Sequence, residues 1–139
     1  MQAPLLDTHA WIWYAGDQSR LDRAELDALD GFDFEDRPLL SDFSLWEIAT
    51  LVSLGRLTLD RPLDQWLLLA ARPAAVRIVP VSVAVAVELE GIPDTFHRDP
   101  ADRVIVATAR ALSLPVLTRD RKIIDSGLVK IWAPVSDCT

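Results

Sequence analysis

Short apolar runs alternate along this chain with longer stretches of helical pattern, and this alternation constrains the fold more than any other feature. The runs have the composition of buried strands: "APLLD" (3–7), "RPLLS" (37–41), "VRIVPVS" (76–82), "LPVLTRD" (114–120) and "LVKIW" (128–132). Helical patterns lie between them, over residues 8–17, 19–31, 42–57, 63–72, 83–91, 99–113 and 121–127. Strands that alternate with helices predict an α/β domain of three layers with a mainly parallel central sheet.

The length and composition predict a single domain. At 139 residues and 50% hydrophobic content, residues 1–139 can form one core that needs neither disulfides nor metals to hold it. The only cysteine, Cys138, excludes an internal disulfide and fits a reducing compartment. No signal-peptide pattern and no apolar span of membrane length occur in the sequence. We therefore expect a soluble, cytoplasmic protein with no membrane partner.

The charge is acidic overall but uneven along the chain. A net charge of −7 and a pI near 4.7 argue against broad, non-specific binding of nucleic acid. Residues 98–122, however, carry more basic than acidic side chains. We predict a local basic rim formed by Arg98, Arg103, Arg110, Arg119, Arg121 and Lys122.

Four acidic residues stand where strands end or helices begin. Asp7 follows the first strand, Asp120 follows the strand pattern "PVLTR", and Glu47 and Asp102 fall in early turns of helices. Ligands of parallel sheets bind beyond the carboxyl ends of the strands, so all four can meet at one edge. Like charges so close cannot all stay ionised without a cation. Carboxylates without cysteine and with few histidines favour Mg²⁺ or Mn²⁺ rather than zinc.

Helix capping offers an alternative explanation for most of these acids. Asp7 and Asp120 fit the N-cap positions of the helices that follow them. Asp99 fits an N-cap with Pro100 at the first helical position, and Asp102 then occupies the third, where an acid favours the helix dipole. Glu47 has no such explanation, because it lies within the apolar stretch 45–52 and a charge there should face a polar cleft.

The histidines and tryptophans allow weaker inferences. His9 is best explained as a residue in the first turn of a helix, whereas His97 stands beside Arg98 and the acids and is a candidate for substrate contact. The tryptophans lie mostly in apolar runs, which indicates core or a partner surface. We expect such a surface near Trp11, Trp46 and Leu51.

Four blocks of the sequence, in order and spacing, resemble the signature blocks of PIN-domain proteins, above all the VapC-like toxins of bacterial type II toxin–antitoxin systems. The blocks are "LLDTHAWIW", "SDFSLWEIATLVSLGRL", "HRDPADRVIVATARAL" and "VLTRDRKI". The resemblance implies a PIN-like α/β/α sandwich and a ribonuclease that uses Mg²⁺ or Mn²⁺. Matched block by block, it assigns Asp7, Glu47, Asp102 and Asp120 as catalytic metal-binding acids. Ala101 replaces a bulky residue usual in the third block, which leaves the acids untouched.

The resemblance also extends the candidate site and its partners. Asp99, Arg98, Arg103 and Thr118 are additional candidate members, and we expect Arg98, Arg103, Arg119 and Arg121 to contact phosphates of an RNA substrate. It implies a small cognate antitoxin whose tail enters the acidic cleft, and a homodimer. Two alternatives stay open: a nuclease or phosphatase that acts on DNA or another phosphate substrate through the same acids, and a catalytically silent PIN-like binding module.

Overall fold

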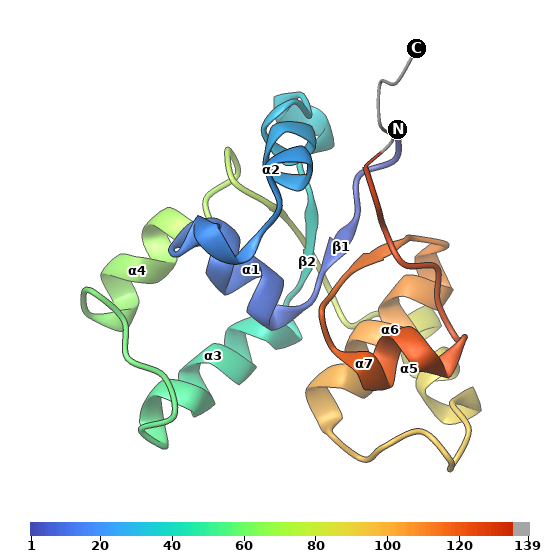
Figure 1. Cartoon of the computed structure of the whole chain (residues 1–139). Helices are drawn as coiled ribbons and strands as arrows, with labels where there is room; N and C mark the ends of the chain where they lie inside the picture. Colours follow the sequence, from blue (N-terminus) through green and yellow to red (C-terminus); the bar gives the residue numbers. More distant parts are fainter. Residues whose placement is uncertain (135–139) are drawn as a thin grey trace.

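A parallel sheet of four strands runs through the centre of the computed structural model, which describes residues 1–134 (Figure 1). The strands are β1 (Leu5–Leu6), β2 (Leu39–Ser41), β3 (Arg77–Val79) and β4 (Val116–Leu117), in the order β3-β2-β1-β4. Every pairing in the sheet is parallel. The predicted parallel α/β architecture is confirmed, and β1 lies inside the sheet between two partners.

The two faces of the sheet are separated by the alternation of side chains along each strand. Leu6, Leu40 and Leu117 belong to one hydrophobic cluster. Their neighbours Leu5, Leu39 and Val116 belong to a second cluster on the opposite face. Because both faces of these short strands are apolar, each face must be covered by helices.

The N-terminal helices pack against the first cluster and lie to the left of the strands in Figure 1. They are α1 (Thr8–Ala15), α2 (Arg23–Asp30), α3 (Phe43–Ser53) and α4 (Leu63–Ala70). Trp11 of α1 is fully buried and meets Trp66 of α4 edge to face, with ring centroids 5.1 Å apart. This aromatic pair joins α1 and α4 into one layer.

The C-terminal helices form the other layer, to the right in Figure 1. They are α5 (Val83–Gly91), α6 (Pro100–Leu112) and α7 (Arg121–Ser126). Ile105 and Ala109 of α6 pack against the sheet, whereas Val106 and Ala107 pack with Val85 of α5. The helix α6 is therefore buried on two sides, which completes the predicted α/β/α sandwich.

Two predicted elements differ from the structure. The predicted strand 128–132 is reduced to a single parallel bridge between Ile131 and Val116. Its partner strand β4 is only two residues long, so there is no room for a longer pairing. The predicted helix 19–31 is shortened to α2, preceded by a 3₁₀ turn over Gln18–Arg20, because Asp22 takes the N-cap position. Elsewhere each predicted strand and helix has a counterpart, and the structure shortens most of them.

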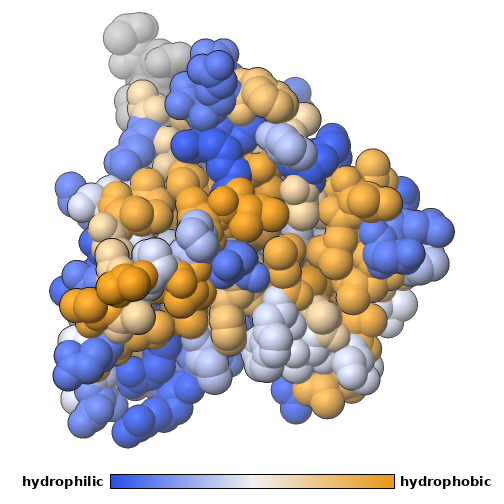
Figure 2. Space-filling model, turned by 180° about the vertical axis from the view of Figure 1, so that it is seen from behind, coloured by the Kyte–Doolittle hydropathy of each residue, from blue (hydrophilic) through white to orange (hydrophobic). Residues whose placement is uncertain are grey.

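Several large apolar side chains stay exposed. Figure 2 shows the molecule from behind, with hydrophobic side chains gathered into patches between polar ones. Exposed apolar residues in and beside β3 and α5 are Ile78, Val81, Val83 and Val87. No helix within residues 1–134 is long and apolar enough to cross a membrane. Cys138 lies outside the described residues.

Candidate active site

Asp7 is held rigidly at the carboxyl end of β1. It is 5% exposed and occupies the N-cap position of α1, where Oδ1 accepts a hydrogen bond of 2.7 Å from the backbone N–H of Ala10. Its other oxygen, Oδ2, accepts a hydrogen bond from the hydroxyl of Thr118 at the end of β4. The capping explanation and the functional one are thus compatible, because one carboxylate caps the helix and also lines the cleft.

Thr118 connects two of the predicted acids. Its Oγ1 donates to Asp7 and accepts a hydrogen bond of 3.0 Å from the backbone N–H of Asp120. Asp120 in turn caps α7 by accepting a hydrogen bond of 2.9 Å from the backbone N–H of Lys122. Thr118 therefore fixes the relative position of Asp7 and Asp120.

Asp102 is placed by the start of α6. Asp99 is the N-cap and accepts a hydrogen bond of 3.1 Å from the backbone N–H of Asp102, with Pro100 in the first turn. This is the predicted capping arrangement, and it leaves the Asp102 carboxylate free to turn toward the cleft.

Glu47 enters the cleft from α3. The neighbouring Ile48 is fully buried, and the Ser44 and Thr8 hydroxyls, 2.9 Å apart, are hydrogen-bonded between α3 and α1. This contact sets the separation of the two helices beside the cleft. Glu47 is half-buried there. The sequence predicts that this charge faces a polar cleft, and the polar groups of that cleft are the other acids.

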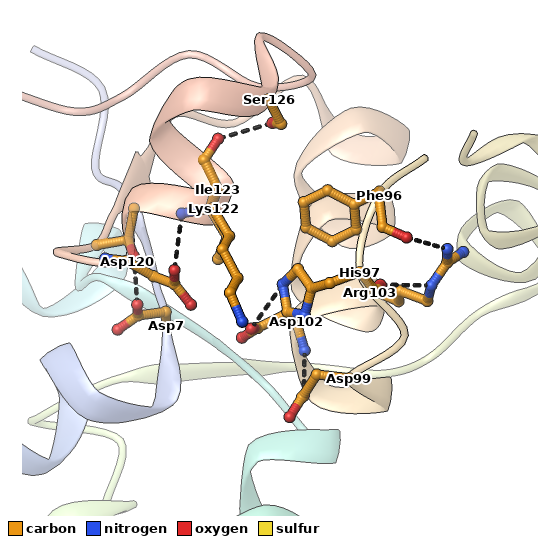
Figure 3. Close-up of polar contacts among 11 residues, drawn as sticks. Asp7, Phe96, His97, Asp99, Asp102, Arg103, Asp120, Lys122, Ile123 and Ser126 are labelled. Atoms are coloured by element: carbon orange, nitrogen blue, oxygen red, sulfur yellow. Dashed lines mark hydrogen bonds and ion pairs between the residues drawn. The ribbon is translucent and has the colours of Figure 1, made fainter. Parts of the chain in front are cut away.

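All four predicted acids therefore line one cleft of about 440 Å³. Its full lining is Asp7, Thr8, His9, Trp13, Glu47, His97, Asp99, Asp102, Arg119, Asp120 and Lys122. Figure 3 shows Asp7, Asp102 and Asp120 approaching one another from the sheet, α6 and the start of α7. The expected convergence at the carboxyl edge of the sheet is what the structure shows.

The electrostatics of the cleft favour the uncharged forms of Asp7, Glu47 and Asp102. Burial, reinforced by the charges of Asp99 and Asp120, raises the pKa of Asp102 to about 8. Burial also raises the pKa of Asp7, although the hydrogen bond from Thr118 opposes the shift. The pKa of Glu47 is raised by burial and by the charges of Asp99 and Asp7. A divalent cation would relieve this repulsion, and its preferred donors are carboxylate oxygens, so the residues present fit such an ion.

His97 lies beside the acids on the loop that precedes α6. Its Nε2 atom is 3.1 Å from Oδ2 of Asp102 (Figure 3). The contact does not have hydrogen-bond geometry, so Nε2 is buried without a hydrogen-bond partner among the described residues. One ligand atom each from His97, Asp102 and Asp120 lie within 4.8 Å of one another.

The structure places the arginines of the predicted basic rim in different settings. Arg103 does not line the cleft, because its guanidinium donates to the carbonyl oxygens of His97 and Phe96, at 2.9 and 2.7 Å. Arg119 lines the cleft, together with Lys122. Arg98 is exposed, and Arg121 is paired with Asp125 at 2.8 Å on the surface of α7.

Glu25 is a residue that the sequence analysis missed. Its side chain is 6% exposed and binds the Arg119 guanidinium through both oxygens, while Oε1 also accepts a hydrogen bond of 2.8 Å from the Asp22 backbone N–H. Burial raises the pKa of Glu25, but the Arg119 and Asp22 contacts outweigh it and lower the pKa overall. The only local signal was the Asp22-x-x-Glu25 capping pattern, which gives no hint of a partner 94 residues away.

Comparison with known proteins now defines the class of protein. The PIN domain family model matches residues 5–126, so this chain belongs to the PIN domain family. The chain is 32% identical over 123 residues to "Ribonuclease VapC22" of Mycobacterium tuberculosis (strain ATCC 25618 / H37Rv), a match that covers 88% of this chain and 91% of that protein.

Among solved structures, the fold is similar to that of FitAcB from Neisseria gonorrhoeae. The TM-score is 0.65 at 24% sequence identity, with 94% of this chain and 96% of that chain covered. This likeness supports the PIN-like α/β/α fold.

Proposed function

We propose that this protein is a metal-dependent ribonuclease, the toxin of a type II toxin–antitoxin pair, which hydrolyses RNA phosphodiester bonds. The observation that carries the proposal is the convergence of Asp7, Glu47, Asp102 and Asp120 in one cleft. Its substrate class is supported by the 32% identity to a protein named Ribonuclease VapC22. A cytoplasmic location follows from this role.

The residues of the cleft have separate tasks in this mechanism. Asp7, Asp102 and Asp120 would hold Mg²⁺ or Mn²⁺, directly or through water. The bound ion would supply activation of a water molecule and stabilisation of the departing oxygen. Glu47 approaches from α3 and would hold the ion or orient the attacking water. Arg119 and Lys122, which line the same cleft, bind phosphates that flank the scissile bond.

The test is cleavage of an end-labelled RNA pool by purified protein with Mg²⁺ or Mn²⁺, with EDTA as the metal-free control. We expect metal-dependent fragments that an excess of unlabelled RNA suppresses and an equal excess of DNA does not. Suppression by DNA would identify a DNA nuclease. Tight RNA binding without fragments under any metal would identify a silent binding module, and either result would overturn the proposal.

The second cleft of the molecule suits the antitoxin. It measures about 970 Å³ and lies between α1 and α4. Apolar residues such as Trp13, Leu57 and Leu69 line it together with charged residues such as Asp17, Arg20 and Arg61. Trp11 is fully buried at its base and is therefore not part of the exposed surface that the sequence suggested, whereas Trp46 is 55% exposed. An amphipathic segment of an antitoxin would fill this cleft and direct its tail, with an arginine, into the acidic one. Co-expression of such a partner should relieve growth arrest caused by the toxin alone.

A homodimer is the assembly that we propose for the free protein. Val83 and Val87 project from α5 with exposures of 82% and 65%, next to exposed Ile78 and Val81. Contact between two copies of this surface would bury side chains that a monomer leaves in water. Light scattering of the purified protein should give twice the monomer mass, and Val87→Lys should shift the mass toward the monomer.

A further inference from the structure

His97 differs from the four acids of the cleft because it offers nitrogen rather than oxygen. Its Nε2 atom lies 3.1 Å from Oδ2 of Asp102, and no described residue, Asp102 included, forms a hydrogen bond with that nitrogen. A buried polar atom without a partner costs free energy, so such an atom at a functional site requires an explanation. Its position among carboxylate oxygens points to a ligand that the protein binds there.

The loop that carries His97 is built to hold the ring in place. Phe96 is 6% exposed and is anchored in the hydrophobic cluster between α5, α6 and α7. Arg103 donates to the carbonyl oxygens of Phe96 and His97 and lies over the Phe96 ring, 5.9 Å from its centroid. The His97 ring itself packs on Phe96, with centroids 4.5 Å apart. These contacts restrict the imidazole before any ligand arrives, which is how metal sites are pre-organised.

We propose that His97 is a nitrogen ligand of the divalent cation, together with Asp102 and Asp120, and that it biases the site toward Mn²⁺ over Mg²⁺. One ring nitrogen of His97 and one carboxylate oxygen from each acid already lie within 4.8 Å of one another. The inference rests on the proposed function, because it concerns the same cleft. It adds a ligand type that the four acids do not have.

The chemistry of the donors explains the bias. Mg²⁺ is a hard ion that retains water and binds oxygen ligands, whereas imidazole is a normal ligand of first-row transition ions. An imidazole in the ligand set therefore adds more to the binding of Mn²⁺ than to that of Mg²⁺. Arg103 acts as a positioning residue in this arrangement, because it binds the backbone that carries His97 and stays outside the cleft.

The direct test is pulsed electron paramagnetic resonance of wild-type protein loaded with Mn²⁺. The sequence has two histidines, His9 and His97, and both line the cleft. We expect nitrogen coupling to Mn²⁺ that changes when histidine is labelled with ¹⁵N. The coupling should disappear in His97→Phe and persist in His9→Phe, the matched control. Phenylalanine keeps a ring against Phe96 and removes both nitrogens.

The ratio of the affinities for Mn²⁺ and Mg²⁺ provides a second readout, which would not change if His97 had only a structural role. In titrations followed by calorimetry, His97→Phe should weaken Mn²⁺ binding by about 10-fold or more and Mg²⁺ binding much less, so that the ratio of the two affinities falls. Equal losses for both ions would overturn the inference.

The outcomes also separate this inference from the proposed function. Wild-type protein that binds Mn²⁺ and cleaves RNA without any nitrogen coupling would overturn the role of His97 alone. Coupling that survives in His97→Phe and is lost in His9→Phe would do the same, by assigning the nitrogen to His9. Wild-type protein that binds neither Mn²⁺ nor Mg²⁺ would overturn both the inference and the metal-dependent mechanism.

Discussion

The surroundings of Asp102 oppose its proposed role. Partial burial among other acids disfavours its negative charge, whereas binding of a cation requires that charge. Asp102→Asn keeps the shape and removes the charge. We expect RNA cleavage to fall by about 100-fold or more, since even changes outside the ligand shell cost 10–100-fold in metal sites. In EDTA at pH 8 the variant should be more stable than wild type by about 1–2 kcal/mol, because a repelled charge is gone. Cleavage assays and thermal melts check both results.

Asp125→Asn is the control for loss of a negative charge, because Asp125 is exposed on α7 and paired only with Arg121. It should leave cleavage unchanged. Full cleavage by Asp102→Asn combined with a lower Tm would mean that Asp102 serves only the helix dipole.

Glu25 supports the cleft from outside the metal site. Glu25→Gln leaves the Arg119 guanidinium without a charged partner, so Arg119 loses the orientation that α2 gives it. Because Arg119 is 39% exposed, we expect a loss of about 1–2 kcal/mol, between the values for surface and buried ion pairs. The KM for RNA should rise, whereas Mn²⁺ affinity should stay unchanged.

Asp27→Asn is the matched control on the same helix, because its pair with Arg23 is exposed. This control should change stability by less than about 0.5 kcal/mol. Weaker Mn²⁺ binding in Glu25→Gln would contradict the assignment and place the Glu25–Arg119 pair within the metal site.

At the scale of the element, α6 depends on its N-cap. Asp99→Ala removes the acceptor for the Asp102 N–H and should cost about 1 kcal/mol, whereas Asp99→Asn retains the cap and should be close to neutral. Urea denaturation compares the two variants. If Asp99→Asn abolished cleavage while Asp99→Ala and Asp99→Asn were equally stable, Asp99 would be a member of the metal site rather than a cap.

Local signals predicted the elements well. Gly and Pro boundaries, apolar runs and the Asp99–Pro100 cap are properties of neighbouring residues, so strands and helices could be placed from the sequence. The strand predicted over 128–132 failed because its length depends on β4, which is more than ten residues away in the chain and ends after two residues. Periodicity carries no information on how long a partner strand is.

The convergence of the four acids in one cleft could also be predicted, because parallel topology brings strand ends together and Glu47 had no place in an apolar core. The roles of the arginines could not. Arg103 binds backbone carbonyls, and Arg119 pairs with Glu25. Both are tertiary contacts that composition does not encode. Arg103 is held outside the cleft by its contacts, whereas Arg119 pairs with Glu25 and still lines the cleft, where we propose that it binds phosphate.

At the scale of the whole molecule, the cleft should make stability depend on pH. Burial and neighbouring acids raise the pKa of Asp102 from 3.8 to about 8, so the folded state binds a proton that the unfolded state releases. The stability of the metal-free protein should therefore fall as pH rises from about 4 to about 8. Asp7 and Glu47, whose pKa values are also raised, act in the same direction.

Cation binding should have the opposite dependence on pH, because the ligands must be deprotonated. The rise in Tm caused by Mn²⁺ should grow from pH 5 to pH 8. Thermal melts at each pH, in EDTA and in Mn²⁺, give both trends. A metal-induced rise that shrinks toward pH 8 would exclude carboxylates as the ligands.

The hydrogen bond between Thr118 and Asp7 joins residues 111 positions apart, and β1 needs β4 as its second neighbour in the sheet. A ribosome makes β1 first and β4 last. Until residues up to Asp120 have emerged, the growing polypeptide has neither the hydroxyl that positions Asp7 nor the fourth acid. On the proposed function, a chain still on the ribosome therefore has an incomplete site, and an antitoxin would be needed only after translation has passed Asp120.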